Sequence, residues 1–258
     1  MGKDHVRTRS IDLRRMRRFV PSRIEIQDRA PGRHFGVPPA ATHTEIKMPA
    51  PFDLTLYLVT DPRLVAARGL LATVEAAVRG GATLVQLRDP QAHGRALVEQ
   101  ARALKALLAP LGIPLIINDR VDVAVAADAD GVHLGQDDLG PADARAQLGP
   151  HRILGLSVGN PAEYAASDLS GVDYLGVGPV TATGTKADAG AAIGAAGVAA
   201  VRALTRLPIV GIGGIHAALA PEVIRAGADG VAVVSAICAA PDPQAAALAL
   251  KQAVTAAR

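Results

Sequence analysis

Eight short apolar segments recur along this chain, and they constrain its fold more than any other feature. Each segment is four to seven residues long, and most are rich in β-branched side chains, as is typical of buried strands. Alanine-rich stretches with helical character lie between them, and glycine or proline closes several of these stretches. Strands that alternate with helices predict a parallel sheet. The segments span residues 56–60, 83–87, 114–118, 131–134, 152–157, 172–178, 207–213 and 230–235.

Eight strands is also the number that closes a barrel. The chain has 258 residues, and an α/β barrel typically uses about 250. We therefore predict a (β/α)8 TIM barrel over about residues 54–257, within a single domain of residues 48–258. An open doubly wound sheet is the alternative, but no GxGxxG motif opens the first helix, as such a fold would favour.

The composition narrows the classes of function. Aromatic residues make up only 2% of the chain and tryptophan is absent, which argues against a protein that stacks nucleic-acid bases on aromatic side chains. The single cysteine, Cys238, excludes an internal disulfide and fits a reducing compartment. No apolar run approaches the roughly 18 residues of a membrane span. We expect a cytoplasmic protein with small-molecule substrates, with no nucleic-acid partner and no membrane contact, and the sequence leaves its oligomeric state open.

Residues 1–47 differ in character from the rest of the chain. They hold 11 of the 27 Lys and Arg residues but only 5 of the 24 Asp and Glu residues. They show little periodicity, and their second half is rich in proline and glycine, which is typical of unstructured chain. We predict a basic, disordered extension, or a translation start placed ahead of Met48. A nucleic-acid arm, an organelle presequence and a partner-binding peptide are the functional alternatives.

Polar residues gather where the predicted strands end. In a barrel these ends share one face, and active sites lie there. The agreement among several strands is stronger evidence than any single motif. The residues are Gln86 and Arg88 after the second strand, Asn118 and Asp119 after the third, Gln136, Asp137 and Asp138 after the fourth, Ser157 at the end of the fifth, and Val234 and Ser235 at the end of the eighth.

A phosphate site is indicated by the glycine-rich segment GIGGI at residues 211–215. Loops after the seventh and eighth strands of such barrels commonly bind phosphate through backbone N–H groups, and glycine lets the backbone approach an anion closely. The preceding loop, GPVTATGTKADAG at residues 178–190, is too polar to be core. Thr183, Gly184 and Thr185 could add hydroxyl and amide donors to the same site.

A cation site is indicated by Asp119 and Asp138, which follow neighbouring strands. Mg²⁺ prefers carboxylate oxygens and usually binds through one or two of them together with substrate phosphates. Arg88 and Lys186 would add positive charge. The alternative is that the aspartates cap the helices that follow, which we favour for Asp137. For Asp119 and Asp138 together we favour the metal site, although their spacing alone would leave the two alternatives about even.

A phosphate site beside a Mg²⁺-diphosphate site favours group transfer over nucleophilic catalysis. The sequence contains no evident Ser-His-Asp or Cys-His set. Cys238 follows the eighth strand and is interpreted as a small apolar helix residue. His133 lies inside a strand and is interpreted as a packed core histidine. We therefore expect displacement of a diphosphate ester by a phosphate-bearing acceptor.

From about Leu56 to Val254, the chain resembles a known family, the thiamine phosphate synthases. The matching segments occur in the order and at the spacing of that family. They are LYLVTDP, GGATLVQLRD, PLIINDR, ADGVHLGQDDL, ILGLS, VDYLGVGPVTATGTKADAG, PIVGIGGI and AGADGVAVVSAI.

The resemblance implies a (β/α)8 barrel enzyme with Mg²⁺ as cofactor. It implies a transferase that joins hydroxymethylpyrimidine diphosphate to hydroxyethylthiazole phosphate and releases diphosphate through a dissociative displacement. By position, Gln86, Arg88, Asn118 and Ser157 would contact the pyrimidine diphosphate, Lys186 the departing diphosphate, and Asp119 and Asp138 the Mg²⁺. Thr183, Thr185, Gly214, Val234 and Ser235 would hold the thiazole phosphate. Arg88, Lys186 and Ser157 would be the catalytic residues.

The chain departs from the family pattern at one position. The family usually has lysine two residues after the arginine, where this chain has Pro90. Either Arg95 or Arg120 compensates, or diphosphate binding is weaker. Two rival functions share the barrel, a thiazole tautomerase and a non-catalytic precursor-binding protein. The tautomerase pattern has a histidine after the GxSV segment, whereas here GLSV is followed by Gly159 and Asn160.

Overall fold

The computed structural model describes residues 51–184 and 190–258. Within this part of the chain, eight parallel strands form a closed barrel in sequence order, and β8 pairs back to β1. The predicted (β/α)8 fold is thus confirmed. The predictions for residues 1–47 lie outside the described residues. The strands are β1 (Leu56–Val59), β2 (Leu84–Leu87), β3 (Leu115–Asn118), β4 (Gly131–Leu134), β5 (Ile153–Val158), β6 (Tyr174–Val177), β7 (Ile209–Ile212) and β8 (Gly230–Val233).

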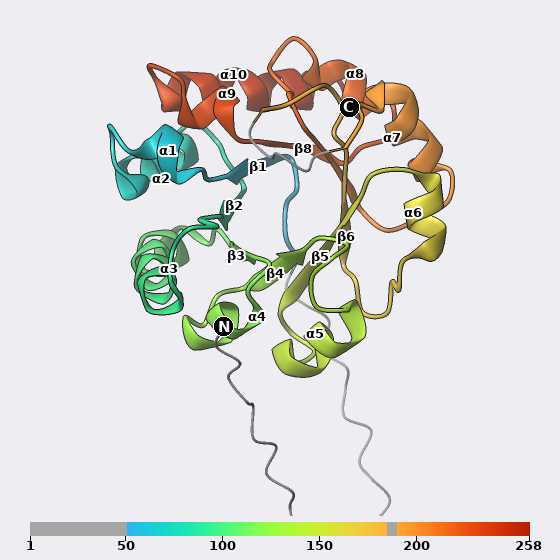
Figure 1. Cartoon of the computed structure of the whole chain (residues 1–258). Coiled ribbons are helices and arrows are strands. Elements are labelled where there is room, and N and C mark those ends of the chain that lie inside the picture. The colour runs from blue at the N-terminus through green and yellow to red at the C-terminus, as the bar shows by residue number, and fades with distance from the viewer. Residues whose placement is uncertain (1–50, 185–189) are drawn as a thin grey trace, which may run out of the picture. The chain divides into compact units, whose positions relative to one another are not determined.

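Helices follow the strands and lie around the outside of the barrel (Figure 1). Two helices follow β1 and two follow β8, and within the described ranges none is long and apolar enough to cross a membrane. The helices are α1 (Pro62–Val65), α2 (Leu70–Arg79), α3 (Gly94–Leu108), α4 (Val121–Ala126), α5 (Pro141–Leu148), α6 (Pro161–Ala166), α7 (Gly194–Arg202), α8 (Ala220–Arg225), α9 (Ser235–Cys238) and α10 (Pro243–Ala256), with a short 3-10 turn, η1 (Ala109–Leu111), after α3.

The strands bury both faces, and this double burial produces two apolar layers. Successive side chains of a strand point to opposite faces. In β1, Leu56 and Leu58 belong to the layer between barrel and helices, whereas Tyr57 and Val59 belong to the barrel interior. The interior layer also contains Tyr174 of β6. The rings of Tyr174 and Phe52 pack edge to face, with their centroids 5.7 Å apart. Alternation therefore decides which side chains face the helices and which face the barrel axis.

The face at the amino ends of the strands is held by a repeated polar contact. An aspartate directly before each of β4, β6 and β8 accepts the backbone N–H at or next to the start of a neighbouring strand and pairs with a basic side chain. The three sets are Asp130 with the N–H of Leu115 and with Lys105, Asp173 with the N–H of Leu154 and with Arg145, and Asp229 with the N–H of Ile209 and with Arg202. These contacts satisfy backbone donors that the parallel ladder leaves unpaired.

Two local expectations were wrong at the other face. The eighth strand ends at Val233, and Ser235 already begins α9, because the chain turns at Val234. Asp137 does not cap the next helix, since α5 begins at Pro141 and Gly140 occupies the N-cap position. Asp119 is not a cap either, because Arg120 holds that position before α4. The side chains of Asp119 and Asp137 are therefore not used as helix caps.

Candidate active site

A cavity of about 470 Å³ opens at the carboxyl ends of the strands. Eight of the residues predicted from sequence line it together: Gln86, Arg88, Asn118, Ser157, Thr183, Gly214, Val234 and Ser235. They come from the ends of β2, β3 and β5 and from the connections after β6, β7 and β8. The closed barrel thus brings into one cavity residues that are up to about 150 positions apart in the sequence. Thr185 and Lys186 lie outside the described residues.

A buried chain of hydrogen bonds crosses the floor of this cavity. The side-chain amide of Gln86 donates to the hydroxyl of Tyr57 at 2.7 Å, and the hydroxyls of Tyr57 and Tyr174 lie 2.9 Å apart. The Tyr174 hydroxyl is 2.9 Å from Nδ1 of His133, and Nε2 of His133 is 2.9 Å from Oγ of Ser157. The chain therefore connects two predicted substrate-binding residues, Gln86 and Ser157, through three side chains that the sequence did not single out as functional.

Strand register and two glycines make room for this chain. His133 pairs in register with Gly155, and Ser157 pairs with Gly176. A β-carbon at Gly155 would overlap both the Tyr174 ring and the His133 ring, and one at Gly176 would press on the His133 ring. Both positions admit only glycine without a shift of these rings, because interiors are close-packed.

Burial fixes the protonation of the two tyrosines. Both side chains are almost fully buried, and burial raises the pKa of each phenol well above its ordinary value. They stay neutral at physiological pH, so they act as hydrogen-bonding groups and not as bases. His133 is buried, as the sequence predicted, but it also lines the cavity. The alternation of β4 could have revealed this role, because Val132 and Leu134 belong to the layer under the helices.

The loops after β6 and β7 lie against each other at one end of the cavity. The backbone N–H groups of Val180 and Thr181 donate to the carbonyls of Ile212 and Gly213 at 2.8 and 3.0 Å. Gly213 and Gly214 have φ values of 102° and 63°, a region that favours glycine. This backbone turn brings Gly214 against Thr181 and Ala182. Thr183, Gly214 and Ser235 all line the cavity. The arrangement fits the predicted phosphate site.

The two predicted metal-binding carboxylates are exposed on the same face. Asp119 follows β3 with a φ of 62°, and the side-chain amide of Asn118 donates to it at 2.5 Å. Asp138 follows β4 and accepts the N–H of Gly135 at 2.6 Å. Neither lines the cavity, although Asn118 and Asp137 do. Residues 51–184 and 190–258 contain no group of three or more acidic, histidine or cysteine side chains placed to hold a metal.

Arg88 lies between this cavity and a second, smaller pocket, because its side chain lines both. The side chain is only 18% exposed, and its guanidinium is 3.9 Å from the carboxylate of Asp61. By contrast, Arg95 is 94% exposed and pairs with Glu99, and Arg120 pairs with Asp122 at 2.6 Å. Neither of the latter two lines either pocket. Cys238 is buried in α9, as predicted, and burial raises its pKa to about 11.

Comparisons with known proteins show the family of this chain. The family model described as thiamine monophosphate synthase matches residues 56–237. A thiamine-phosphate synthase from Xanthobacter autotrophicus is 87% identical over 211 residues, which are 82% of this chain and 100% of that protein. A thiamine-phosphate synthase from Azorhizobium caulinodans is 67% identical over 204 residues, which are 79% of this chain and 96% of that protein.

Solved structures show the same relationship. A thiamine phosphate pyrophosphorylase from Pyrococcus furiosus superposes with a TM-score of 0.72 at 36% identity, covering 79% of this chain and 96% of the other. A 3-hexulose-6-phosphate synthase, at 21% identity and a TM-score of 0.55, covers 78% of this chain and 99% of the other and shares the fold alone. The family match, the identities and the arrangement of the cavity lead to one conclusion: the chain belongs to the thiamine monophosphate synthase family.

Proposed function

We propose that this chain is a thiamine phosphate synthase. It would join hydroxymethylpyrimidine diphosphate to hydroxyethylthiazole phosphate and release diphosphate. The observation that carries the proposal is the 470 Å³ cavity at the carboxyl ends of the strands, which combines a buried polar floor, an arginine and a glycine-threonine turn. These features match the three chemical parts of the two substrates. The family match and the 87% identity to a thiamine-phosphate synthase support it.

The polar floor suits the pyrimidine. Gln86 and Ser157 are oriented by the hydrogen-bond chain through Tyr57, Tyr174 and His133. A heterocycle with ring nitrogens and an amino group needs donors and acceptors at fixed positions, and a buried, fully connected chain supplies them with little freedom to reorganise. In this proposal Gln86, Asn118 and Ser157 hold the pyrimidine and so direct its methylene carbon toward the second substrate.

Arg88 is placed to bind the diphosphate. The sequence assigns Lys186 to the diphosphate as well. As the bond between the methylene carbon and the diphosphate oxygen breaks, the electron pair leaves with the diphosphate. A guanidinium beside that oxygen stabilises the developing charge more than it stabilises the intact ester, which is what accelerates the reaction.

The donor set at Asp119 and Asp138 fits Mg²⁺. Two carboxylates at the ends of adjacent strands, neither of them a helix cap, match the usual binding of Mg²⁺ by one or two carboxylates, waters and substrate phosphates. When bound there, the ion would add positive charge beside the diphosphate.

The glycine-threonine turn suits the thiazole phosphate. Thr183, Gly214, Val234 and Ser235, with Thr185 from the sequence, would hold that phosphate by hydroxyl and backbone N–H donors. The thiazole nitrogen would then give its lone pair to the pyrimidine methylene carbon and form the new C–N bond. No proton has to be removed in this step, so the proposal assigns no role as general base to His133, Asp137 and Glu163, which also line the cavity.

The tautomerase alternative receives no support from the segment after β5. Asn160 caps α6, and its side chain accepts the N–H groups of Ala162 and Glu163. Gly159, the first residue after GLSV, lines the cavity and carries no side chain that could move a proton. Glu163 of α6 also lines the cavity, but its carboxylate accepts the backbone N–H of Gly159 and the side-chain amide of Asn160.

Turnover by the purified full-length chain tests the proposal. The protein is given both substrates with Mg²⁺, and thiamine phosphate is followed by chromatography. We expect product in the complete mixture, none with EDTA, and a loss of at least about a hundredfold in Asp119→Ala. A folded protein that forms no thiamine phosphate would overturn the proposal and favour a binding protein or a tautomerase, which an isomerisation assay on the thiazole substrate would separate.

A further inference from the structure

A pocket of about 200 Å³ lies beside the main cavity, between the chain that leaves β1 and the chain that leaves β2. Arg88 lines both spaces, so the pocket adjoins the end of the cavity assigned to the diphosphate. Its other lining residues include Asp61 and Arg63 from the β1 side, Pro90 and Gln91 from the β2 side, and Gly184 from the loop after β6. Of these, the basic side chain at position 63 has no assigned role.

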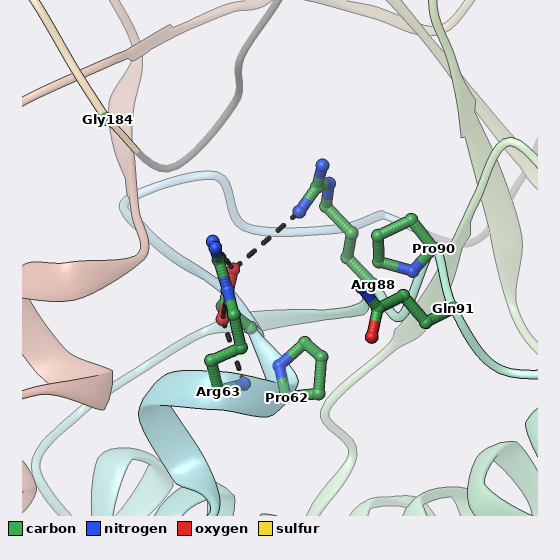
Figure 2. Close-up of a pocket in the computed structure, with 7 residues that line it drawn as sticks. Pro62, Arg63, Arg88, Pro90, Gln91 and Gly184 are labelled. Carbon is green, nitrogen blue, oxygen red and sulfur yellow. Dashed lines mark hydrogen bonds and ion pairs between the residues drawn. The ribbon is translucent and has the colours of Figure 1, made fainter.

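One carboxylate holds both arginines of this pocket. Asp61 is almost fully buried, and its two oxygens accept from Nη2 and Nε of Arg63 at 3.1 and 3.3 Å. The guanidinium of Arg88 is 3.9 Å from the same carboxylate. In Figure 2 the guanidinium groups of Arg63 and Arg88 extend into the same space, on the side where Gly184 lies. Two cations on one anion leave the pocket with a net positive charge.

The charge state of Asp61 agrees with this arrangement. Burial by itself would raise the pKa of its carboxyl, but the hydrogen bonds from the Arg63 side chain and from the backbone N–H groups of Arg63 and Leu64 outweigh that effect, so its pKa is below the ordinary value. The carboxylate remains ionised and keeps both guanidinium groups oriented.

Apart from Arg88, the β2 side of the pocket supplies no charged side chain. Pro90 has neither a charged side chain nor a backbone N–H to donate, and it occupies the position where the family pattern described above has lysine. Arg95 and Arg120, the nearest alternatives along the sequence, are held by Glu99 and Asp122 and line neither space. Among the described residues, the second cation that lines this pocket beside Arg88 is Arg63, from the β1 side.

We propose that Arg63 is a diphosphate-binding residue, which together with Arg88 holds the diphosphate of the pyrimidine substrate in place of a basic side chain at position 90. This inference rests on the proposed function. Arg63 contacts the leaving group in this proposal, so its loss affects the pyrimidine substrate and the diphosphate product and leaves the thiazole substrate unaffected.

The test compares Arg63→Gln with Arg95→Gln as a matched surface control, and with Arg63→Gln/Pro90→Lys as a rescue. Binding of inorganic diphosphate with Mg²⁺ is measured by calorimetry, and KM is measured for each substrate. For Arg63→Gln we expect weaker diphosphate binding and a higher KM for the pyrimidine substrate, each by about threefold to tenfold. The KM for thiazole phosphate should not change. Arg95→Gln should match the wild type, and the double variant should recover most of the loss.

Pro90→Lys alone should alter activity by less than about tenfold, because Arg63 already supplies the second charge. The inference is overturned if Arg63→Gln binds diphosphate as tightly as the wild type, or if the added lysine rescues nothing. It is also overturned if both KM values rise equally, since that would indicate a purely structural role for Arg63. Calorimetry needs no turnover, so a failure of the proposed function would appear as absent product in the wild type, separately from these results.

Discussion

The hydroxyl of Tyr174 lies 2.9 Å from Nδ1 of His133, inside the barrel and directly beneath the cavity. This contact joins the Gln86–Tyr57 half of the polar floor to the His133–Ser157 half. Both halves would have unsatisfied buried groups without it. Because the Tyr174 hydroxyl is a hydrogen-bond partner of both Tyr57 and His133, this one oxygen atom affects both the stability of the protein and the shape of the site.

Replacement of Tyr174 by phenylalanine is expected to lower the free energy of unfolding by about 1–3 kcal/mol, because Tyr57 and His133 each lose a buried partner. It should also raise the KM for the pyrimidine substrate more than the KM for thiazole phosphate. Urea unfolding and steady-state kinetics measure these effects. Tyr164→Phe is the matched control, since its hydroxyl donates to a carbonyl at the outer surface. Equal effects of the two substitutions would contradict the role of the floor.

Replacement of Gly155 by alanine should disturb the same site without removing a polar atom. The added methyl group meets the rings of Tyr174 and His133, and overpacking of this kind typically costs about 1–3 kcal/mol. Gly140→Ala provides the comparison, because a methyl group there has open space around it. Thermal unfolding of both variants checks the prediction. A Gly155→Ala protein as stable as the wild type would show that the barrel interior can relax.

At the opposite face, Arg145→Ala is expected to destabilise the fold by about 2 kcal/mol with little effect on KM. The guanidinium bonds Asp173 at 2.8 Å and also donates to the carbonyls of Gly149, Arg152 and Gly171, so its removal leaves several acceptors unpaired. Arg95→Ala, an exposed residue on α3, should cost less than about 0.5 kcal/mol. Chemical denaturation compares the two variants, and similar losses would contradict the prediction.

The pH dependence of stability should report on Asp61. Its pKa is lower in the folded protein than in the unfolded chain, so its contribution is fully present above the unfolded pKa of about 4 and is lost as the pH falls through the folded pKa. Asp61→Asn should therefore be less stable than the wild type by about 1 kcal/mol at pH 7. The difference in stability between Asp61→Asn and the wild type should become smaller below about pH 4. Melting curves between pH 3 and pH 7 test this, and a constant gap would rule it out.

Cys238 should resist alkylation in the folded protein. Its side chain is buried and its pKa is about 11, whereas the thiolate is the reactive form. Iodoacetamide at pH 8 is expected to label the thiol only after unfolding, at a rate that follows denaturant concentration. Rapid labelling of the native protein would show that α9 opens readily.

Much of the fold was predictable because it depends on local pattern. Alternation of short apolar strands with helical stretches is dictated by which side chains can be buried, and all eight strands formed where the pattern indicated. The ends of several strands differ from the expected ones by one or two residues, as at β6, which begins at Tyr174. The cap expected at Asp137 failed because the chain continues to Gly140 before α5 begins.

The sequence by itself determined the barrel, the face that carries the site, and the residue types that line it, since each follows from strand order and from the positions just after the strands. Only the tertiary structure decided that Tyr57, Tyr174 and His133 form one buried chain, and that Arg63 lies across a pocket from Pro90. Both arrangements bring together strands or loops that are distant in the sequence. They depend on register and on which side chain faces inward, and these are settled when the barrel closes and its interior packs.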